Sequence, residues 1–179
     1  MTHTKQTRLL AIAPSSRGFG FVIFEGDKEL IDWGNKTVNS GDKNSQCLAK
    51  LEKLMNAYQP TMLVMQATKD SNRAARIKKL CRQIVARAKT RKLKVKLLSY
   101  RQVNDFFHPN AANTKYERAE FIAAQFPETL GVNLPPKRRA WTSEDGRMDI
   151  FEAAALVLSE QNHRLKHVTK NIKISLDQI

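Results

Sequence analysis

The distribution of apolar residues predicts that the chain opens with β-strands. Residues 9–12 form an uninterrupted apolar run, the sequence Pro-Ser-Ser-Arg-Gly follows, and residues 19–24 are rich in phenylalanine and β-branched side chains. Two such runs around a turn of Pro, Ser and Gly are typical of a β-hairpin. Residues 29–38 continue this composition and precede a polar break at 39–43. We therefore expect three consecutive strands.

Helical spacing then alternates with short apolar runs. Leucine and methionine recur at helical spacing over residues 44–58, which predicts a helix that ends before Pro60. Residues 62–65 are apolar throughout, as expected of a buried parallel strand. A long basic helix is predicted over 71–89, and a fifth strand over 93–99.

The second half of the chain is predicted to be mostly helical. Short helices are expected over 101–107 and 114–126, and an apolar helix over 149–159. A loop rich in proline and arginine, residues 131–141, lies between the last two helices. Three strands, a helix, a strand, a helix, a strand and further helices indicate a layered α/β fold.

Length and composition favour one domain. A chain of 179 residues with 41% hydrophobic residues suits a single ordinary core, and we assign this domain to residues 1–162. Residues 163–179 are basic, with a weak alternation of isoleucine and leucine at positions 172, 174 and 176. We expect this segment to be a C-terminal tail or an edge strand.

Positive charge is concentrated in one window of the sequence. The formal net charge is +14, and residues 71–104 contain twelve Lys and Arg but no Asp or Glu. The rest of the chain has a net charge of only +2. Like charges one turn apart on a helix repel each other, so solvated helices normally mix the two signs. The window therefore predicts a polyanionic partner, and nucleic acid is the simplest one.

Other features exclude several protein classes. No apolar run is long enough to cross a membrane, and the N-terminus has no signal-peptide pattern. Cys47 and Cys81 lack a second Cys or His at ligand spacing, so neither a disulfide framework nor a zinc site is expected. We expect a soluble, cytoplasmic protein with no membrane partner and with two buried thiols.

The opening hairpin resembles that of RNase H-like nucleases, and most closely that of the RuvC-like Holliday-junction resolvases. In that family an aspartate that holds catalytic metal stands at the place of Ala13, directly before the proline. Residues 61–67 resemble the family's fourth strand, in which an apolar run ends in a metal-binding glutamate. Gln66 stands at that place here. Both replacements remove a negative charge.

A third segment supports the same resemblance. Residues 98–107 and 112–119 are similar to the stretch that follows the family's fifth strand. Lys115 matches a lysine that lies near the substrate. The resemblance covers about residues 8–159, and it implies an RNase H-like mixed five-stranded sheet flanked by helices.

A fourth segment, residues 148–156, resembles the family's closing helix, in which two acids three residues apart precede Ala and Leu. Asp149 and Glu152 fill these places, and at positions i and i+3 they share one face of a helix. The family's chemistry uses two Mg²⁺ ions, or Mn²⁺, about 4 Å apart, which activate a water and steady the leaving oxygen. Mg²⁺ requires hard oxygen ligands, so carboxylates belong at these positions.

Four positions of a two-metal catalytic site are thus predicted, and half of them carry a carboxylate. Ala13 has no ligand atom and Gln66 has only a neutral carbonyl, which leaves Asp149 and Glu152 as metal ligands. We expect strongly impaired metal binding and cleavage. Taken singly, these residues are ordinary: a small core residue, a capped strand end, two acids favoured by a helix dipole. Their order and separation favour the nuclease interpretation.

The resemblance implies branched or duplex DNA as the partner, and a homodimer because two symmetric incisions need two sites. The helix after the fourth strand lies near the substrate in such resolvases. The candidate DNA contacts are basic residues of this helix, the site and the loop before the last helix: Arg73, Arg76, Lys79, Arg82, Lys115, Lys137, Arg138 and Arg139. Phe106 and Phe107 are expected in the core, with a wedge role at a branch point as the alternative. His108 is a candidate replacement ligand or water-orienting group.

Several functions remain open at this point. The first is a RuvC-like, Mg²⁺-dependent endonuclease for branched DNA, crippled in this chain by experiment or by evolution. The second is a non-catalytic pseudo-nuclease that binds nucleic acid or serves as a scaffold, and a third is an RNA-processing RNase H-like nuclease. Actin-like sugar kinases and ATPases also begin with such a hairpin. They require a second related half and glycine-rich phosphate loops, whereas this chain has 7 glycines in 179 residues.

Overall fold

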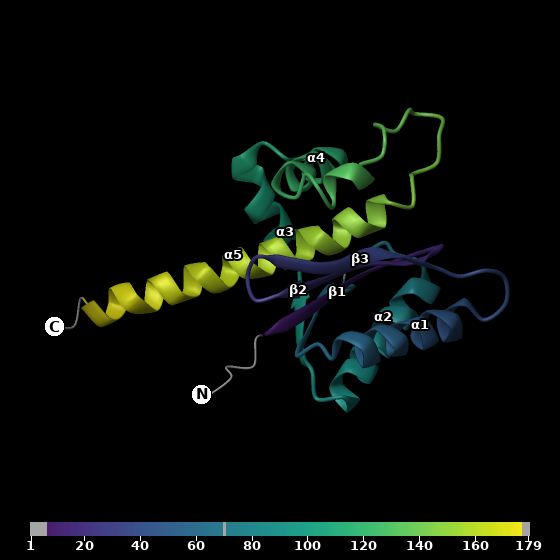
Figure 1. Cartoon of the computed structure of the whole chain (residues 1–179), viewed down its shortest axis with the longest axis horizontal. Helices are drawn as coiled ribbons and strands as arrows, with labels where there is room; N and C mark the ends of the chain where they lie inside the picture. Colours follow the sequence, from purple (N-terminus) through teal and green to yellow (C-terminus); the bar gives the residue numbers. More distant parts are fainter. Residues whose placement is uncertain (1–6, 70, 177–179) are drawn as a thin grey trace.

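A five-stranded sheet with helices on both faces forms the centre of the molecule (Figure 1). The computed structural model describes residues 7–69 and 71–176, with side chains to residue 167 and at 169. The strand order is β3-β2-β1-β4-β5. Strand β2 is antiparallel to both of its neighbours, β1 and β3, whereas β4 and β5 run parallel to β1. The predicted α/β fold with a mixed five-stranded sheet is confirmed.

The opening hairpin is longer than its apolar runs predicted. Strands β1 (Arg8–Ser15) and β2 (Gly18–Glu25) enclose a turn of only two residues, and β3 (Glu29–Thr37) follows. Ala13 therefore lies within β1, where it pairs with Gly20, and not at the tip of the hairpin. The pairing with β2 continues through Pro14, which lies beyond Ile12, the last residue of β1 that pairs with β4.

Two helices cover one face of the sheet. Helix α1 (Lys43–Tyr58) joins β3 to β4 (Met62–Gln66), and helix α2 (Ala75–Thr90) joins β4 to β5 (Lys94–Leu98). Asp42 caps α1 by accepting a hydrogen bond from the Ser45 amide at 3.1 Å. The apolar sides of both helices pack on the sheet, and the thiols of Cys47 and Cys81 are buried among them, as predicted. Burial raises the pKa of both thiols.

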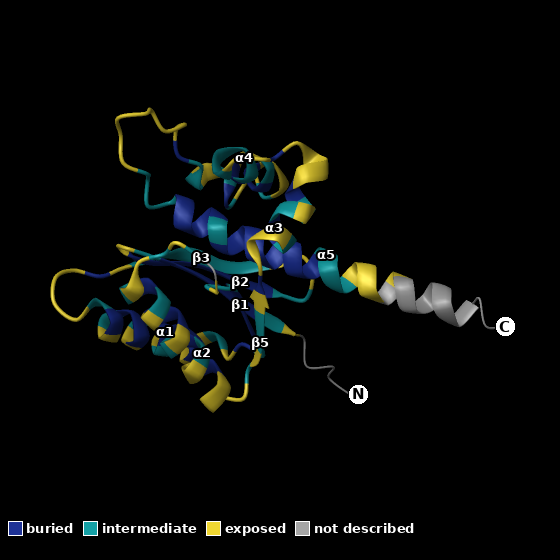
Figure 2. Ribbon diagram, turned by 180° about the vertical axis from the view of Figure 1, so that it is seen from behind, coloured by how far each residue is buried: buried dark blue, intermediate teal, exposed yellow. Residues whose placement is uncertain are grey.

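Three helices cover the opposite face. Helices α3 (Tyr100–Phe107), α4 (Lys115–Gln125) and α5 (Met148–Leu176) lie together there, with the short 3-10 turns η1 (His108–Asn110) and η2 (Gly131–Asn133) between them. The middle of the sheet and the first turns of α5 are the most buried parts of the chain (Figure 2). Phe107 is fully buried, and the ring of Phe106 packs edge-on against it with 4.8 Å between the ring centroids. The expectation that both residues belong to the core is confirmed.

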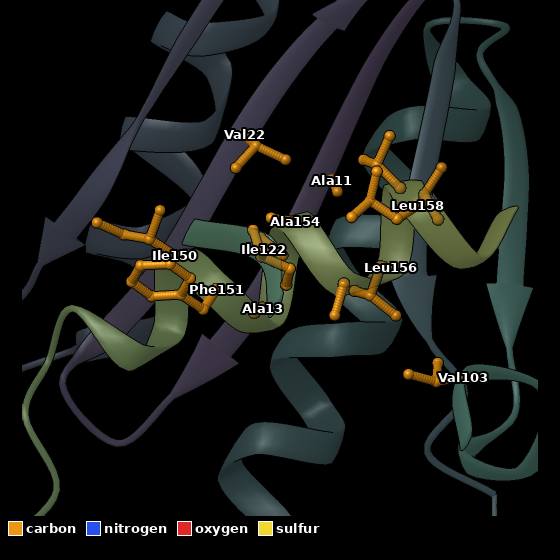
Figure 3. Packing of buried hydrophobic residues seen from close by; sticks show 14 of the residues in the cluster. Ala11, Ala13, Val22, Val103, Ile122, Ile150, Phe151, Ala154, Leu156 and Leu158 are labelled. Atoms are coloured by element: carbon orange, nitrogen blue, oxygen red, sulfur yellow. The ribbon is translucent and has the colours of Figure 1, made fainter. Parts of the chain in front are cut away.

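Alternation along β1 decides which layer each side chain enters, because successive side chains of a strand point to opposite faces. Leu10 and Ile12 belong to the core under α1 and α2. Leu9, Ala11 and Ala13 belong to the core under α5. Figure 3 shows Ala13 in this second core, with apolar side chains of α5 nearby. The register of β1 thus directs position 13 toward the helix that carries Asp149 and Glu152.

Gly20 allows α5 to start directly on the sheet. A Cβ atom at Gly20 would lie 2.2 Å from the carbonyl carbon and oxygen of Asp149. Only glycine fits such a close approach of two backbones. Because Gly20 pairs with Ala13, this contact sets the position of Asp149 relative to the end of β1.

The C-terminal segment differs from its prediction. Residues 163–176 continue helix α5, so this part of the chain is helical and not an edge strand, and 177–179 lie outside the described residues. Arg164 pairs with Glu160 one turn earlier at 2.6 Å and with Asp27 at 3.1 Å. No Gly or Pro interrupts the sequence after Gly146, so nothing ends the helix where the apolar pattern fades. Among the described helices, none combines the length and the apolar character needed to cross a bilayer.

Candidate functional site

The site predicted from the sequence lies where the ends of β1 and β4 meet the start of α5. A cavity of about 230 Å³ opens there. Ala13, Gln66, Lys115 and Glu152 all line it, so the structure brings together four positions that are far apart in the sequence. Asp149 lies one turn before Glu152 on α5 and is buried against the sheet. The cavity walls are otherwise largely apolar, with Ile12, Val103 and Phe151 among them.

Arg73 bridges the two strand ends. Its Nη1 donates to the carbonyl oxygen of Pro14 at 3.1 Å, and its Nη2 donates to Oε1 of Gln66 at 3.0 Å. Arg73 lines the same cavity as Ala13, whose side chain is only 4% exposed and brings no polar atom. A cation occupies the region between positions 13 and 66, where the family resemblance implied two carboxylates.

The carboxylates of α5 have different surroundings. Asp149 is 5% exposed, and this burial raises its pKa, aided by the charge of Glu152 and opposed by the Ser15 side chain. Glu152 forms an ion pair with Lys115, which also contacts Oε2 of Glu144 at 2.6 Å. Burial alone would lower the pKa of Lys115, but its two acidic neighbours raise it above the ordinary value. Lys115 is thus a positive charge held between two carboxylates.

These residues do not fit a two-metal centre. Among the side chains that the structure describes, at residues 7–69, 71–167 and 169, no group of three or more His, Cys, Asp or Glu is placed to hold a metal ion. Ala13 has no ligand atom, and the amide oxygen of Gln66 already accepts a hydrogen bond from Arg73. Glu152 has Lys115 as its counterion. Divalent ions of this type need several hard oxygen ligands, and this arrangement offers too few.

The cavity wall also contains two residues that the sequence analysis missed. Tyr100, the first residue of α3, is 62% exposed at the cavity. The guanidinium of Arg118 lies 5.7 Å from the Tyr100 ring and 5.6 Å from the Phe107 ring. Arg118 follows Lys115 by three positions in a predicted helix, so helical spacing was a usable signal for it. For Tyr100 the only signal was the capping box of Ser99 and Gln102, which marks Tyr100 as the first residue of a helix.

A third missed residue, Glu144, required the structure. It belongs to the loop before α5, and its side chain reaches Lys115. Its carbonyl oxygen accepts from Nη1 of Arg17 at 2.6 Å, and the carbonyl of Gly146 accepts from Asn35 at 2.8 Å. These two hydrogen bonds fasten the loop to the turn of the β1–β2 hairpin and to β3. No local pattern in the sequence indicates these contacts.

The remaining candidate DNA contacts fall into three groups. Arg76 donates to Asn44 at 2.9 Å and to the carbonyls of Ser15 and Ser16 at 3.2 and 3.3 Å, so it ties α2 to the hairpin turn. Lys79 and Arg82 line a separate hollow beside the N-terminus of α1.

The third group is the exposed part of the loop between η2 and α5. Lys137, Arg138 and Arg139 are all exposed there. Nε of Arg138 donates to the Thr142 carbonyl at 2.6 Å. The guanidinium of Arg139 lies 5.9 Å from the ring of Trp141, which is 80% exposed. This loop presents three cations and one aromatic ring to solvent.

His108 lies away from the cavity. It is exposed in η1, its Nδ1 is 2.7 Å from Oδ1 of Asn113, and it lines a different hollow. It is not placed to replace a metal ligand of the site. The sequence around this single loop histidine contains no pattern from which its place in the fold could be predicted.

The strand order, the layer of helices on each face and the cavity at the strand ends define an RNase H-like fold. Neither a protein-family model nor a curated protein matches the sequence. Solved structures identify the variant of the fold. Thermus thermophilus RuvC superposes with a TM-score of 0.62 and 13% identity, over 89% of this chain and 97% of that one.

Two further structures agree. Thermus thermophilus RuvC in complex with a Holliday junction substrate gives a TM-score of 0.58 and 14% identity, over 89% of this chain and 96% of that one. The yeast mitochondrial Holliday junction resolvase Ydc2 gives a TM-score of 0.61 and 14% identity, over 94% of this chain and 86% of that one. The chain therefore has a RuvC-like fold, as its motifs predicted.

Proposed function

We propose that this protein binds branched or duplex DNA and that the chain does not cut it by the two-metal route. The observation that carries this proposal is the composition of the cavity at the strand ends, where Ala13, Gln66 and Arg73 stand in the place of a carboxylate cluster. Support for DNA as the partner comes from the shared fold, since Thermus thermophilus RuvC is known in complex with a Holliday junction substrate.

The distribution of charge supports a nucleic-acid partner independently of the fold. The formal net charge is +14, and the acid-free window 71–104 includes the whole of α2. Such a basic element attracts the phosphate backbone and gives an affinity that falls with salt. Lys79 and Arg82 are exposed on α2, and they are the residues of this helix that we assign to phosphate contacts.

Loss of cutting follows from the ligand count. When bound in a site of this fold, two Mg²⁺ or Mn²⁺ ions activate the attacking water and steady the leaving oxygen. Here Asp149 and Glu152 are the only two of four positions with a carboxylate, and Glu152 is paired with Lys115. The chain keeps the surface that receives DNA, but it lacks the groups that would hold the ions.

We further propose that the protein acts as a homodimer in the cytoplasm. A four-way junction has two-fold symmetry, and a C2 dimer presents two equal surfaces to it. The two free, buried cysteines suit a reducing compartment. Sedimentation equilibrium of the free protein tests the dimer, and a monomer at all concentrations would contradict it.

The experiment for DNA binding compares two double variants with equal charge loss. K79Q/R82Q removes two cations from exposed positions of α2, whereas K28Q/K53Q removes two exposed lysines elsewhere. Lys28 follows β2, at the end of the sheet opposite the cavity. Fluorescence anisotropy with a labelled four-way junction should show about a tenfold or greater loss of affinity for K79Q/R82Q only.

Three further probes define the specificity of binding. A linear duplex and a single-stranded RNA of equal length should bind the wild-type protein more weakly than the junction does. Tighter binding of RNA would favour the RNA-processing alternative. No salt-dependent binding to any of these polymers would overturn the proposal.

A further inference from the structure

The cavity at the ends of β1 and β4 contains an inverted charge pattern. A two-metal nuclease site gathers carboxylates, and it binds a phosphate only after divalent cations have neutralised them. Here the side chains that line the cavity include three cations, Arg73, Lys115 and Arg118, and one carboxylate, Glu152. Lys115 is paired with that carboxylate and with Glu144. Three cations thus stand against two carboxylates, Glu152 and Glu144, which gives this group of side chains a formal net charge of +1.

Arg73 is held in place with donors to spare. A guanidinium has five N–H donors. Within the described part of the chain, the hydrogen bonds of Arg73 use one N–H of Nη1 toward Pro14 and one of Nη2 toward Gln66. Both acceptors are neutral, so its charge is not cancelled by them. A side chain fixed in this way loses little conformational entropy when it binds a ligand.

Arg118 is fixed on the other wall in a similar manner. Its Nε donates to the Ala112 carbonyl at 3.4 Å, and its Nη2 donates to Asn104 and to the Asn113 carbonyl. The aromatic rings of Tyr100 and Phe107 support its guanidinium. Among the described contacts, Nη1 of Arg118 has no acceptor of its own. Two anchored guanidinium groups thus line one cavity.

We propose that this cavity binds one backbone phosphate of DNA directly through Arg73 and Arg118, without a divalent ion. Planar guanidinium groups match the oxygens of a phosphate better than any other side chain. The volume of about 230 Å³ accommodates a phosphate group together with several waters. Lys115 has a supporting part, because its ion pairs with Glu152 and Glu144 offset one of their two negative charges and so reduce their repulsion of the phosphate. The inference rests on DNA being the partner.

The first test is the affinity for a labelled four-way junction in EDTA, measured over a range of potassium chloride concentrations. R73Q should lower the affinity about tenfold and reduce the slope of log K against log salt by about 0.9, the value for one phosphate contact. R87Q is the matched control, since it removes one cation from α2, the helix that follows Arg73, at a residue whose side chain is 55% exposed and pairs with Glu52. R87Q should change the affinity less than twofold. Thermal melting of both variants checks that they are folded.

The second test introduces a negative charge into the cavity by substitution of Ala13. A13D puts a carboxylate beside Arg73, whereas A13N puts a neutral group of the same size there. Binding in EDTA should be at least fivefold weaker for A13D than for A13N, because only the aspartate cancels the guanidinium charge. Any strain from the larger side chain is common to both variants.

The outcomes separate the two levels of the proposal. A junction affinity that is unchanged in R73Q, or that disappears when EDTA removes divalent ions, would overturn the phosphate site and leave DNA binding in place. Equal affinities of A13D and A13N would also overturn it. Absence of salt-dependent binding by the wild-type protein would instead overturn the proposed function itself.

Discussion

Ala13 and Gln66 change the chemistry of the cavity in two different ways. Ala13 removes a ligand atom altogether, while Gln66 keeps an oxygen that accepts a hydrogen bond from Arg73. Both positions were predicted from the sequence, because the two segments that contain them resemble the strands of the RuvC-like family. The sequence was not sufficient for Arg73, which was predicted as a DNA contact only. The bonds of Arg73 to Pro14 and Gln66 depend on the pairing of β1 with β4.

Restoring the two acids should restore metal binding only in part. In A13D/Q66E the new carboxylates would face Arg73, which competes with a metal ion for them. We expect isothermal titration with Mn²⁺ to give no measurable heat for the wild-type protein, weak binding for A13D/Q66E, and at least tenfold tighter binding for A13D/Q66E/R73A.

The same three proteins should be assayed for Mg²⁺-dependent cleavage of a four-way junction. Cutting by a revertant would indicate a nuclease frame disabled at two positions. Micromolar Mn²⁺ affinity of the wild-type protein would contradict our account of the site.

At the scale of elements, α5 determines where the acids lie. Its first turn packs on β2 at Gly20. The helix is longer than the predicted 149–159, since it spans Met148–Leu176. The alternation of isoleucine and leucine near its end suggested a strand, although the segment contains no residue that breaks a helix. A few apolar residues at alternate positions are a weak signal, since they fit both structures.

Substitution of Gly20 tests the packing of α5. G20A places a methyl group within 2.2 Å of the Asp149 carbonyl, so the start of the helix must move. We expect a loss of about 1–3 kcal/mol in the free energy of unfolding, measured by urea denaturation. G146A is the control, because its methyl group would meet its nearest neighbour, Arg17, at an ordinary 3.7 Å. Equal stability of G20A and the wild type would contradict the close contact.

A hydrogen bond between α1 and β3 predicts a pH effect. The hydroxyl of Tyr58 donates to Oδ2 of Asp32 at 2.6 Å, and this bond, followed by burial, raises the pKa of Tyr58 above its ordinary value of 10.0. A raised pKa of the folded state means that the contribution to stability is complete below pH 10.0 and is lost as pH rises through the higher folded value. Y58F should lose about 1 kcal/mol at pH 8.

The same variant should lose less stability than the wild type as pH rises above 10. Urea denaturation at intervals from pH 8 to pH 11.5 measures both curves. Parallel curves for Y58F and the wild type would show that the hydrogen bond makes no contribution.

At the scale of the whole molecule, the order of strands and helices along the chain was predictable from the sequence. The contacts between distant segments around the cavity were not. Apolar periodicity predicted five strands in the right order, and the motif positions predicted which strand ends meet at α5. The contacts of Glu144 with Lys115 and Arg17 join a loop, a helix and a hairpin that are distant in sequence. Such contacts depend on the assembled fold, and no local pattern encodes them. Helical spacing places Arg118 on the same face as Lys115, but its contacts with α3 and with the turn after α3 depend on the assembled fold.

The proposed function assigns metal-free binding of DNA to cations in two places of the assembled molecule. Cations of α2 and of the loop before α5 are exposed and would contact phosphates there, and the cavity would add two anchored guanidinium groups. Because each phosphate contact releases counterions, the number of contacts is measurable from salt dependence alone.

The most direct test of this account is the affinity of the wild-type protein for a four-way junction, measured as a function of salt in EDTA. We predict tight binding at low salt with a slope of log K against log salt near −5, which corresponds to about six neutralised phosphates. The same junction should remain uncut when Mg²⁺ is then added in excess. Binding that requires Mg²⁺, or incision of the junction after its addition, would contradict the account.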